Sequence, residues 1–314
     1  MKYYQTNQKT RHRASWMLGL LGIAGMLNSC GEIYDLNAFV WEPEIPLNDS
    51  VFNREIYVHN LALDGVEGLT GQPPDYLDPI LFSLERFSVV HPGYKISDRW
   101  DLGMGGSFGV SISGNNGSRR GLGYGSSSVG GYALMDTAYS QVQDLPTSMT
   151  IMEPGLTSLD AQGAAGSGMG PFAYTFGGNF IRPDKVVNLG SQDPVLAHEA
   201  FMYSHLIYAL SEDLIKSFPT AQNAQRAGLL RPRTLIVRTA RGNFAKLEFL
   251  SYYKDTIDPK NMKRDQRNTP FGYFSFRYIL IKADEVRFGF VKRRPSMTVD
   301  VSRKKTTVHY DEQI

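Results

Sequence analysis

The clearest chemistry in the sequence belongs to Cys30, the only cysteine of the chain. A basic segment at residues 2–13 and an apolar run at 16–27 precede it, and the small residue Ser29 stands directly before it. The apolar run is shorter than the roughly 20 residues that span a bilayer, so the pattern is typical of a signal peptide that ends in a lipobox. In a lipobox the thiol is acylated and the cysteine becomes the new N-terminus. The alternative is a buried core cysteine behind an unrelated apolar run.

Acylation of Cys30 predicts attachment to a membrane. Two or more acyl chains, such as palmitate, anchor a protein stably, whereas a single chain binds only marginally. We therefore expect a lipoprotein signal peptide at residues 1–29 and an acylated tether at 30–54. Gly31 and Glu32 follow the cysteine. Because an aspartate at this place favours retention at the inner membrane of many Gram-negative bacteria, its absence favours the outer membrane, in either leaflet.

Histidine and methionine side chains are the other candidates for chemistry. His198 and Glu199 begin an HExxH-like sequence, but residue 202 is Met, so the zinc-protease motif is incomplete. On a helix, His198 and His205 share a face but lie too far apart to hold one metal ion together. Met169 lies in a Gly- and Ala-rich segment, either as a surface residue or as one that folds over a ligand. No pair of carboxylates stands out for acid–base chemistry, so we expect a protein that is not an enzyme.

The composition excludes one class of partner and favours one class of fold. With 33 Lys and Arg against 31 Asp and Glu, the net charge is only +2, so we expect no nucleic-acid binding. The chain contains 17 Tyr, 17 Phe and 31 Gly. Many short alternating runs among these aromatic and turn-forming residues predict an all-β, antiparallel sandwich or barrel.

The elements that would position the candidate side chains centre on a β-hairpin. Two β-rich runs at 233–239 and 244–253 flank a turn at 240–243, in which Gly242 can adopt a positive φ. A third run at 272–281 completes a predicted antiparallel meander with one buried face. Shorter runs predict further strands at 55–63, 80–90 and 108–113.

Alternation along the hairpin separates its two faces. Buried positions are expected at Leu235, Val237, Leu247 and Phe249. Solvated positions are expected at Arg238, Lys246 and Glu248.

Three segments are less regular. Residues 195–218 have the Ala-, Leu- and Glu-rich composition of a helix that begins after Pro194, although alternation at 202–208 leaves a strand open. Residues 103–131 are dense in glycine, and without a GxxxxGK[ST] motif we interpret them as a mobile loop rather than a phosphate site. Residues 292–314 are basic, and we expect a solvated tail, with an edge strand or a partner-facing surface as alternatives.

Residues 238–246 read RTARGNFAK, and this strand-turn-strand sequence resembles the most recognisable segment of the HmuY-like haem-binding lipoproteins of Gram-negative anaerobes. The order of other segments is similar to that family too: LFSL at 81–84, RWDL at 99–102 and a Gly- and Asn-rich loop at 114–125, all after the lipobox. The resemblance extends over residues 55–281. It implies an all-β, HmuY-like domain at 55–291 with one helical insertion near 195–218.

The same resemblance implies a ligand and its coordinating residues. The family holds haem through two axial side chains, takes it from host haem carriers and passes it to a TonB-dependent outer-membrane receptor. One ligand stands in an aromatic-Ser-His segment before the hairpin, which matches Tyr203-Ser204-His205 in this chain. The other stands earlier, where this chain has no His and Met169 is the nearest candidate. Imidazole and thioether both ligate haem iron, so the resemblance implies a His205–Met169 haem site with Tyr and Phe facing the porphyrin.

Two other functions stay open at this stage. The same fold could bind a related tetrapyrrole or a non-haem ligand, such as a peptide or a glycan. It could also serve as a structural or accessory partner at the cell surface, with the Gly-rich loops as contact sites.

Overall fold

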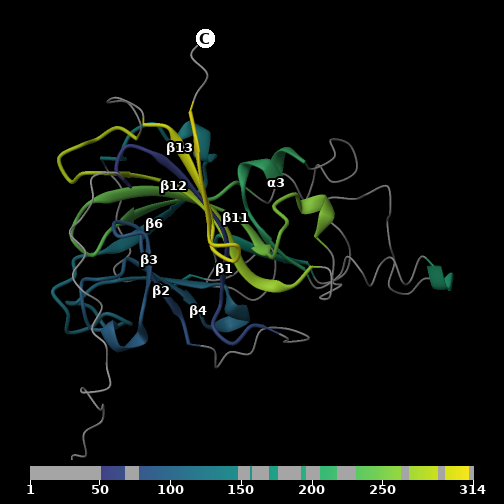
Figure 1. Cartoon of the computed structure of the whole chain (residues 1–314), viewed down its shortest axis with the longest axis horizontal. Helices are drawn as coiled ribbons and strands as arrows, with labels where there is room; N and C mark the ends of the chain where they lie inside the picture. The colour runs from purple at the N-terminus through teal and green to yellow at the C-terminus, as the bar shows by residue number, and fades with distance from the viewer. Residues whose placement is uncertain are drawn as a thin grey trace, which may run out of the picture. The chain divides into compact units, whose positions relative to one another are not determined.

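The computed structural model describes residues 51–67, 78–147, 156–157, 170–175, 192–195, 206–217, 231–262, 269–288 and 294–310. Within these residues the protein is mostly β, and its sheets are largely antiparallel (Figure 1). The all-β prediction is therefore confirmed at the level of fold class. Among the described residues, no helix has both the length and the apolar character needed to span a membrane.

The larger sheet contains seven strands in the order β14-β13-β1-β12-β11-β10-β6. Their bounds are β1 Glu55–Ala62, β6 Gly131–Met135, β10 Thr234–Arg238, β11 Phe244–Tyr253, β12 Phe271–Ile281, β13 Ser296–Asp300 and β14 Lys305–His309. Neighbouring strands are antiparallel except for β1 and β13, which run parallel. The predicted meander is the centre of this sheet.

A second sheet has five strands in the order β3-β2-β4-β5-β7, and two further strands pair separately as β8-β9. Their bounds are β2 Ile80–Ser83, β3 Ser88–Val90, β4 Leu102–Gly105, β5 Ser111–Gly114, β7 Leu156–Thr157, β8 Phe172–Thr175 and β9 Leu206–Ala209. The short helices are α3 Glu212–Lys216 and the 3-10 turns η2 Pro92–Tyr94, η3 Ser107–Gly109, η4 Tyr139–Gln141 and η6 Pro259–Asn261.

The hydrophobic core lies between the two larger sheets. The ring of Phe276 in β12 meets that of Phe82 in β2 edge-on, with centroids 5.5 Å apart. Tyr278 on the same face of β12 donates a hydrogen bond to the Leu84 carbonyl, 3.0 Å away. Burying each large apolar side chain of this kind contributes about 1.5–3 kcal/mol to folding. The alternation seen in the sequence therefore identifies the core face correctly.

The predicted hairpin is confirmed, and the structure gives its register. Arg238 pairs with Phe244 and Leu235 with Leu247, and Gly242 in the turn has φ +96. A left-handed φ is accessible to glycine at little cost. The buried set predicted for this hairpin is fully buried as well.

Two predicted elements differ in extent. Residues 80–90, expected as one strand, form β2 and β3, joined by a turn in which Phe87 has φ +50. Among the described residues of the helix predicted near 195–218, Val195 and Glu212–Lys216 (α3) are helical, while Leu206–Ala209 is strand β9. All four residues of β9 are buried and pair with β8, so tertiary pairing outweighs the local helix propensity. The strand alternative holds for this part, and residues 196–205 lie outside the described residues.

The C-terminal segment also differs from the expected solvated tail. Residues 296–309 of the predicted 292–314 tail contain β13 and β14, which extend the larger sheet beyond β1. All five residues of β14 are exposed, so Lys305 lies on a sheet edge in water. The edge-strand alternative therefore describes these residues.

Candidate functional site

The three site residues predicted from the sequence, Cys30, Met169 and His205, all lie outside the described residues. The strands that follow two of them are described. β8 begins at Phe172, shortly after Met169, and β9 begins at Leu206, directly after His205 in the sequence.

Strands β8 and β9 form an antiparallel ribbon that connects these two parts of the sequence. Phe172 pairs with Ala209 and Thr175 pairs with Leu206. The ribbon is buried against β11, where the Ile207 amide donates to the Tyr253 hydroxyl at 2.9 Å. The segments that lead from Met169 and His205 thus enter neighbouring strands. Their first strand residues stand at opposite ends of the ribbon, roughly 10 Å apart along it.

The aromatic side chains around this ribbon pack against each other. The Phe172 ring lies 4.9 Å from that of Phe249 and 6.1 Å from that of Phe274, measured between centroids. Tyr252 lies 5.3 Å from Phe274, and its hydroxyl donates to the Phe108 carbonyl. These aromatic residues therefore form core, and the expectation that the surplus Tyr and Phe face a porphyrin does not hold for them.

A buried carboxylate clamp joins the two larger sheets. Asp101, 2% exposed, accepts hydrogen bonds from the amides of Leu84 at 2.7 Å and Ala240 at 2.8 Å. Glu85, 3% exposed, accepts from the Thr239 hydroxyl at 2.5 Å and the Asn243 amide group at 2.7 Å. One carboxylate thus holds the β2–β3 turn and the hairpin turn together, and the other reinforces the contact. We call Asp101 and Glu85 the clamp.

Within the clamp, the environment shifts the pKa of Asp101. Burial and, after it, the charge of Glu85 raise the pKa of Asp101 to about 7, although the backbone amides that donate to Asp101 act in the opposite direction. The effect has the sign expected for a carboxyl that loses its hydration next to a like charge.

Three of the four segments on which the sequence analysis based its resemblance, all except the loop at 114–125, meet at the clamp. Residues 81–84 carry the Leu84 amide, residues 99–102 carry Asp101, and residues 238–246 carry Thr239, Ala240 and Asn243. Their shared role in the described structure is to hold the two sheets together. The resemblance is therefore carried by residues that position the fold.

A second charged cluster covers the other face of the larger sheet. Arg277 in β12 binds Glu248 in β11 at 2.7 Å, and Glu212 of α3 lies 3.9 Å from the same guanidinium. Glu248 also accepts from the Glu212 amide at 2.6 Å. Burial raises the pKa of Glu248, and the attraction of Arg277 opposes that shift. Burial also acts to raise the pKa of Glu212, but hydrogen bonds from Lys216 and Ser140 outweigh it and lower the pKa to about 2.

Lys246 completes this cluster beside η4. Its ammonium donates to the carbonyls of Tyr139 and Val142 at 3.2 and 2.8 Å and lies 4.2 Å from the centre of the Tyr139 ring. Burial lowers the pKa of Lys246 to about 8. The predicted solvent exposure of Lys246 and Glu248 is therefore wrong: they are 4% and 1% exposed because η4 and α3 cover them. Arg238, from the same predicted set, is only partly exposed.

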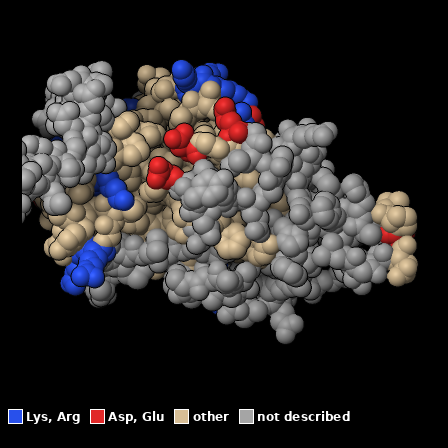
Figure 2. All heavy atoms as spheres, turned by 90° about the horizontal axis from the view of Figure 1, so that it is seen from below, with Lys and Arg blue, Asp and Glu red and all other residues tan. Residues whose placement is uncertain are grey.

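Chemically, these two clusters stabilise the fold. The Lys246 amine is too deeply buried to reach a substrate. Within the described residues, no group of three or more His, Cys, Asp or Glu is arranged to hold a metal ion. Figure 2 shows acidic and basic residues together on the described part of one face, in keeping with the small net charge.

One short motif escaped the sequence prediction. Residues 105–109 read Gly-Gly-Ser-Phe-Gly and match the G-x-S-x-G spacing of a nucleophile elbow. An elbow requires a strand followed by a helix. Here the spacing covers the end of β4 and the 3-10 turn η3, and strand β5 follows antiparallel to β4. The match therefore lacks the structural context of an elbow.

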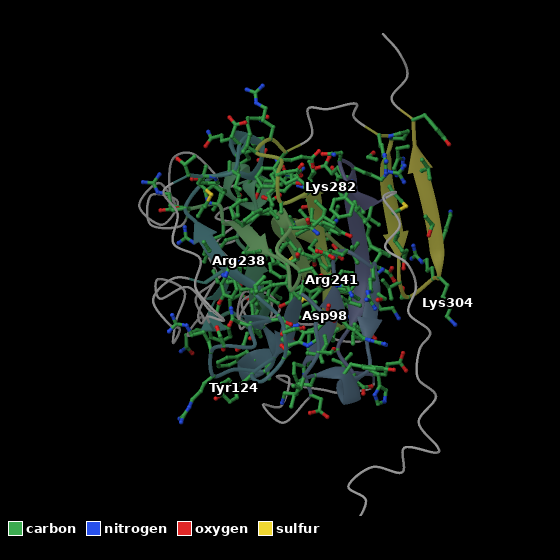
Figure 3. The ribbon with its side chains drawn as sticks, turned by 90° about the vertical axis from the view of Figure 1, so that its left-hand side faces the viewer. Asp98, Tyr124, Arg238, Arg241, Lys282 and Lys304 are labelled. Atoms are coloured by element: carbon green, nitrogen blue, oxygen red, sulfur yellow. The ribbon has the colours of Figure 1, made fainter. Side chains whose placement is uncertain are left out.

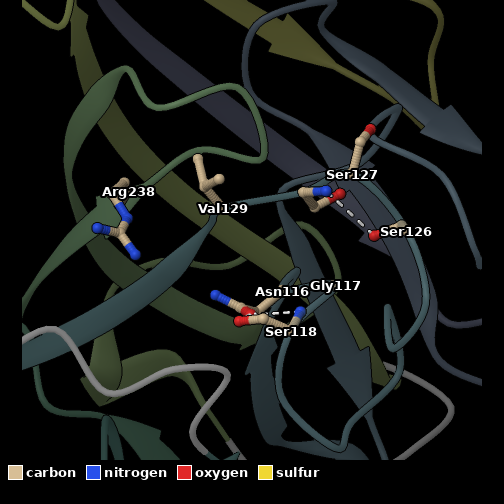
Figure 4. Close-up of a pocket in the computed structure, with 8 residues that line it drawn as sticks. Asn116, Gly117, Ser118, Ser126, Ser127, Val129 and Arg238 are labelled. Carbon is tan, nitrogen blue, oxygen red and sulfur yellow. Dashed lines mark hydrogen bonds between the residues drawn. The ribbon is translucent and has the colours of Figure 1, made fainter.

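An open polar pocket lies beside the hairpin. Residues 116–118, residues 126–128, Val129 and Arg238 line a space of about 470 Å³ (Figure 4). Most of this lining belongs to the glycine-dense segment, which the sequence analysis interpreted as a mobile loop without a ligand. The chain folds back on itself there, with a bridge between Asn116 and Val129. In the sequence, the only sign of this pocket is the Ser- and Asn-rich composition of the loop, and the strand residue Arg238 is brought beside it by folding.

Comparison with known proteins adds no family to this geometry: no family model matches the chain, and no curated protein matches it.

Proposed function

We propose that this protein is an outer-membrane lipoprotein that binds haem through His205 and Met169 and passes it to a TonB-dependent receptor. The protein would be anchored through acylated Cys30 and would act without catalysis. The haem comes from host carriers in this proposal. Its first support is the sequence resemblance at residues 238–246, together with the lipobox.

The structural observation that supports this proposal best is the pairing of β8 with β9. It makes neighbours of two strands that are separated by about 30 residues of sequence, one beginning shortly after Met169 and the other directly after His205. Two axial ligands must approach haem iron from opposite faces of the ring, and the strands begin at opposite ends of one ribbon. A His and a Met side chain are both established axial ligands.

The rigidity of the surrounding frame also favours a binding role. The ribbon packs on β11, and β11 is fixed to β12 along most of its length. A rigid frame next to a binding site reduces the entropic cost of association, because the frame itself needs no ordering.

Titration of the purified protein with hemin tests the proposal. We expect a sharpened, red-shifted Soret band that saturates at one haem per chain. His205→Ala and Met169→Ala should each weaken or abolish this band, because each removes one axial ligand. His309→Ala is the matched control, since His309 is an exposed histidine of β14. The absence of a band, or unchanged spectra in both ligand variants, would refute the site.

A same-fold lipoprotein with a non-haem ligand is the second candidate. The observation that favours it is the pocket beside Arg238, which is lined mainly by hydroxyl and amide groups. An accessory role beside a membrane partner is the third. Saturable hemin binding that depends on His205 distinguishes the first proposal from both.

A further inference from the structure

The pocket beside Arg238 has a preformed wall. The Gly117 amide donates to the Ser128 carbonyl at 2.8 Å, and the Gly125 amide donates to the Gly117 carbonyl at 2.9 Å. Asn116 accepts from both the amide and the hydroxyl of Ser118, at 3.0 and 2.8 Å. These bonds hold the loop in a closed shape before any ligand arrives, which lowers the ordering cost of binding.

Glycine is required at two positions of this wall. A Cβ on Gly117 would lie 1.7 Å from the Ser126 carbonyl oxygen, and one on Gly130 would lie 2.5 Å from the Asn115 carbonyl oxygen. The two sides of the loop can approach this closely only because the side chains are absent. The glycine density of this segment therefore shapes the pocket.

Among the described residues, the pocket lining carries one positive charge and no negative one. Arg238 contributes a guanidinium, and none of the lining residues is acidic. Between residues 102 and 135 the chain has no Asp or Glu, while Arg119 and Arg120 are exposed on the same loop. The nearby Arg241 is paired with Asp98 at 2.9 Å and is not part of the lining (Figure 3). A guanidinium among neutral hydrogen-bonding groups suits one carboxylate-sized anion.

The remaining lining is suited to hydroxyl groups. The four serines provide hydroxyls that donate and accept, and the Asn116 side chain adds an amide. Figure 4 shows Arg238 on one side of the space and Ser126 and Ser127 on the other. The described lining contains no aromatic side chain, whereas a porphyrin needs a large apolar surface. The volume of the pocket, about 470 Å³, falls within the usual range for small-molecule sites.

We propose that this pocket binds an acidic sugar, a hydroxyl-rich molecule with one carboxylate. In this arrangement Arg238 binds the carboxylate, and the hydroxyls of Ser118 and Ser127 bind the sugar hydroxyls across the pocket. The lining contains neither His205 nor Met169, and the two proposals are tested with different probes and variants, so they succeed or fail independently. It would give a surface lipoprotein a contact to uronic- or sialic-acid-containing glycans.

Isothermal titration of the full chain in detergent tests this site, with D-glucuronate and N-acetylneuraminate as probes. At least one probe should bind with a 1:1 stoichiometry. Glucose should bind at least tenfold more weakly than glucuronate, since it lacks the carboxylate. Inorganic phosphate and sulfate should also bind at least tenfold more weakly than the better acidic sugar, because each is much smaller than a sugar and fills less of the space of about 470 Å³.

Two variants connect the binding to the pocket. Arg238→Gln should weaken the better probe at least tenfold, while Arg241→Gln should leave the affinity within twofold. Ser127→Trp places a bulky side chain at an exposed position of the lining and should block the sugar without disturbing the core. Equal binding of glucose, phosphate as tight as the acidic sugars, or an Arg238→Gln and Ser127→Trp pair with unchanged affinity overturns the proposal. So does the absence of binding by both acidic sugars.

Discussion

Substitution of Asp101 by Asn should remove a pH dependence of stability that the clamp creates. Burial and Glu85 raise the pKa of Asp101 from 3.8 to about 7 in the folded chain. The folded state therefore holds a proton more tightly than the unfolded state does. The resulting stabilisation is fully present below about pH 4 and is lost as the pH rises through about 7.

The size of this effect follows from the shift. At 1.36 kcal/mol for each pKa unit, the full change is about 4 kcal/mol, of which about 2–3 kcal/mol falls between pH 5 and pH 8. The carboxamide of the Asp101→Asn variant would be neutral at every pH and cannot contribute this slope. The variant also loses one acceptor for a buried amide of Leu84 or Ala240, which costs about 1–3 kcal/mol at pH 5.

Urea denaturation at several pH values between 5 and 8 measures both terms. The free energy of unfolding of the unmodified chain should fall with pH more steeply than that of Asp101→Asn, and the two curves should approach each other at pH 8. Taking the difference between the chains cancels the contribution of other titrating groups. Parallel curves across this range would show that Asp101 is ionised throughout and would refute the reasoning.

Two further predictions concern other parts of the chain. Glu248→Gln should lower the free energy of unfolding by about 2–4 kcal/mol, because it leaves Arg277 without its 2.7 Å partner in a buried site. In the same urea assay the control Arg287→Gln, which breaks an exposed pair with Asp144, should lower it by less than about 1 kcal/mol. Equal losses in the two variants would contradict the burial of the Glu248–Arg277 pair. Cys30→Ser should move the protein from the membrane fraction to the soluble or unprocessed fraction and abolish incorporation of labelled palmitate, and unchanged labelling would exclude Cys30 as the acylated residue.

The central meander could be predicted from the sequence because its signals are local. Alternation in residues 244–253 and 272–281 determines which side chains share a face, and Gly242 marks the turn. Alternation does not show which segments cover the opposite face of the meander. Lys246 and Glu248 have the polar character of solvated positions, yet η4 and α3 bury them. Those covering segments are distant in the sequence, so no local pattern connects them with the hairpin.

Strand pairing explains the other differences between the prediction and the structure. Leu206–Ala209 combines helix formers with β-compatible residues, and its pairing with Phe172–Thr175 decides in favour of a strand. The basic residues after 292 looked like a tail because the strand formers around Val299 and Val308 are interrupted by the charged run at 303–305. Parallel pairing of β13 with β1 supplies the support that the local sequence lacks.

Asp101 of the clamp stands in a segment that resembles the HmuY-like family, whereas His205 and Met169 are proposed to bind haem. Substitution of Asp101 should therefore change stability, and substitution of His205 or Met169 should change haem binding. The clamp joins the β2–β3 turn to the hairpin turn, and its loss should lower stability. In Asp101→Asn the hemin Soret band should persist at temperatures where the chain stays folded. In His205→Ala the band should weaken while the urea midpoint stays within error of the unmodified chain. One fold can carry unrelated sites. Comparing the two variants therefore tests whether this chain is similar to the HmuY-like family in its ligand site as well as in its fold. Loss of the band in Asp101→Asn with a folded chain would instead make the clamp part of the ligand site.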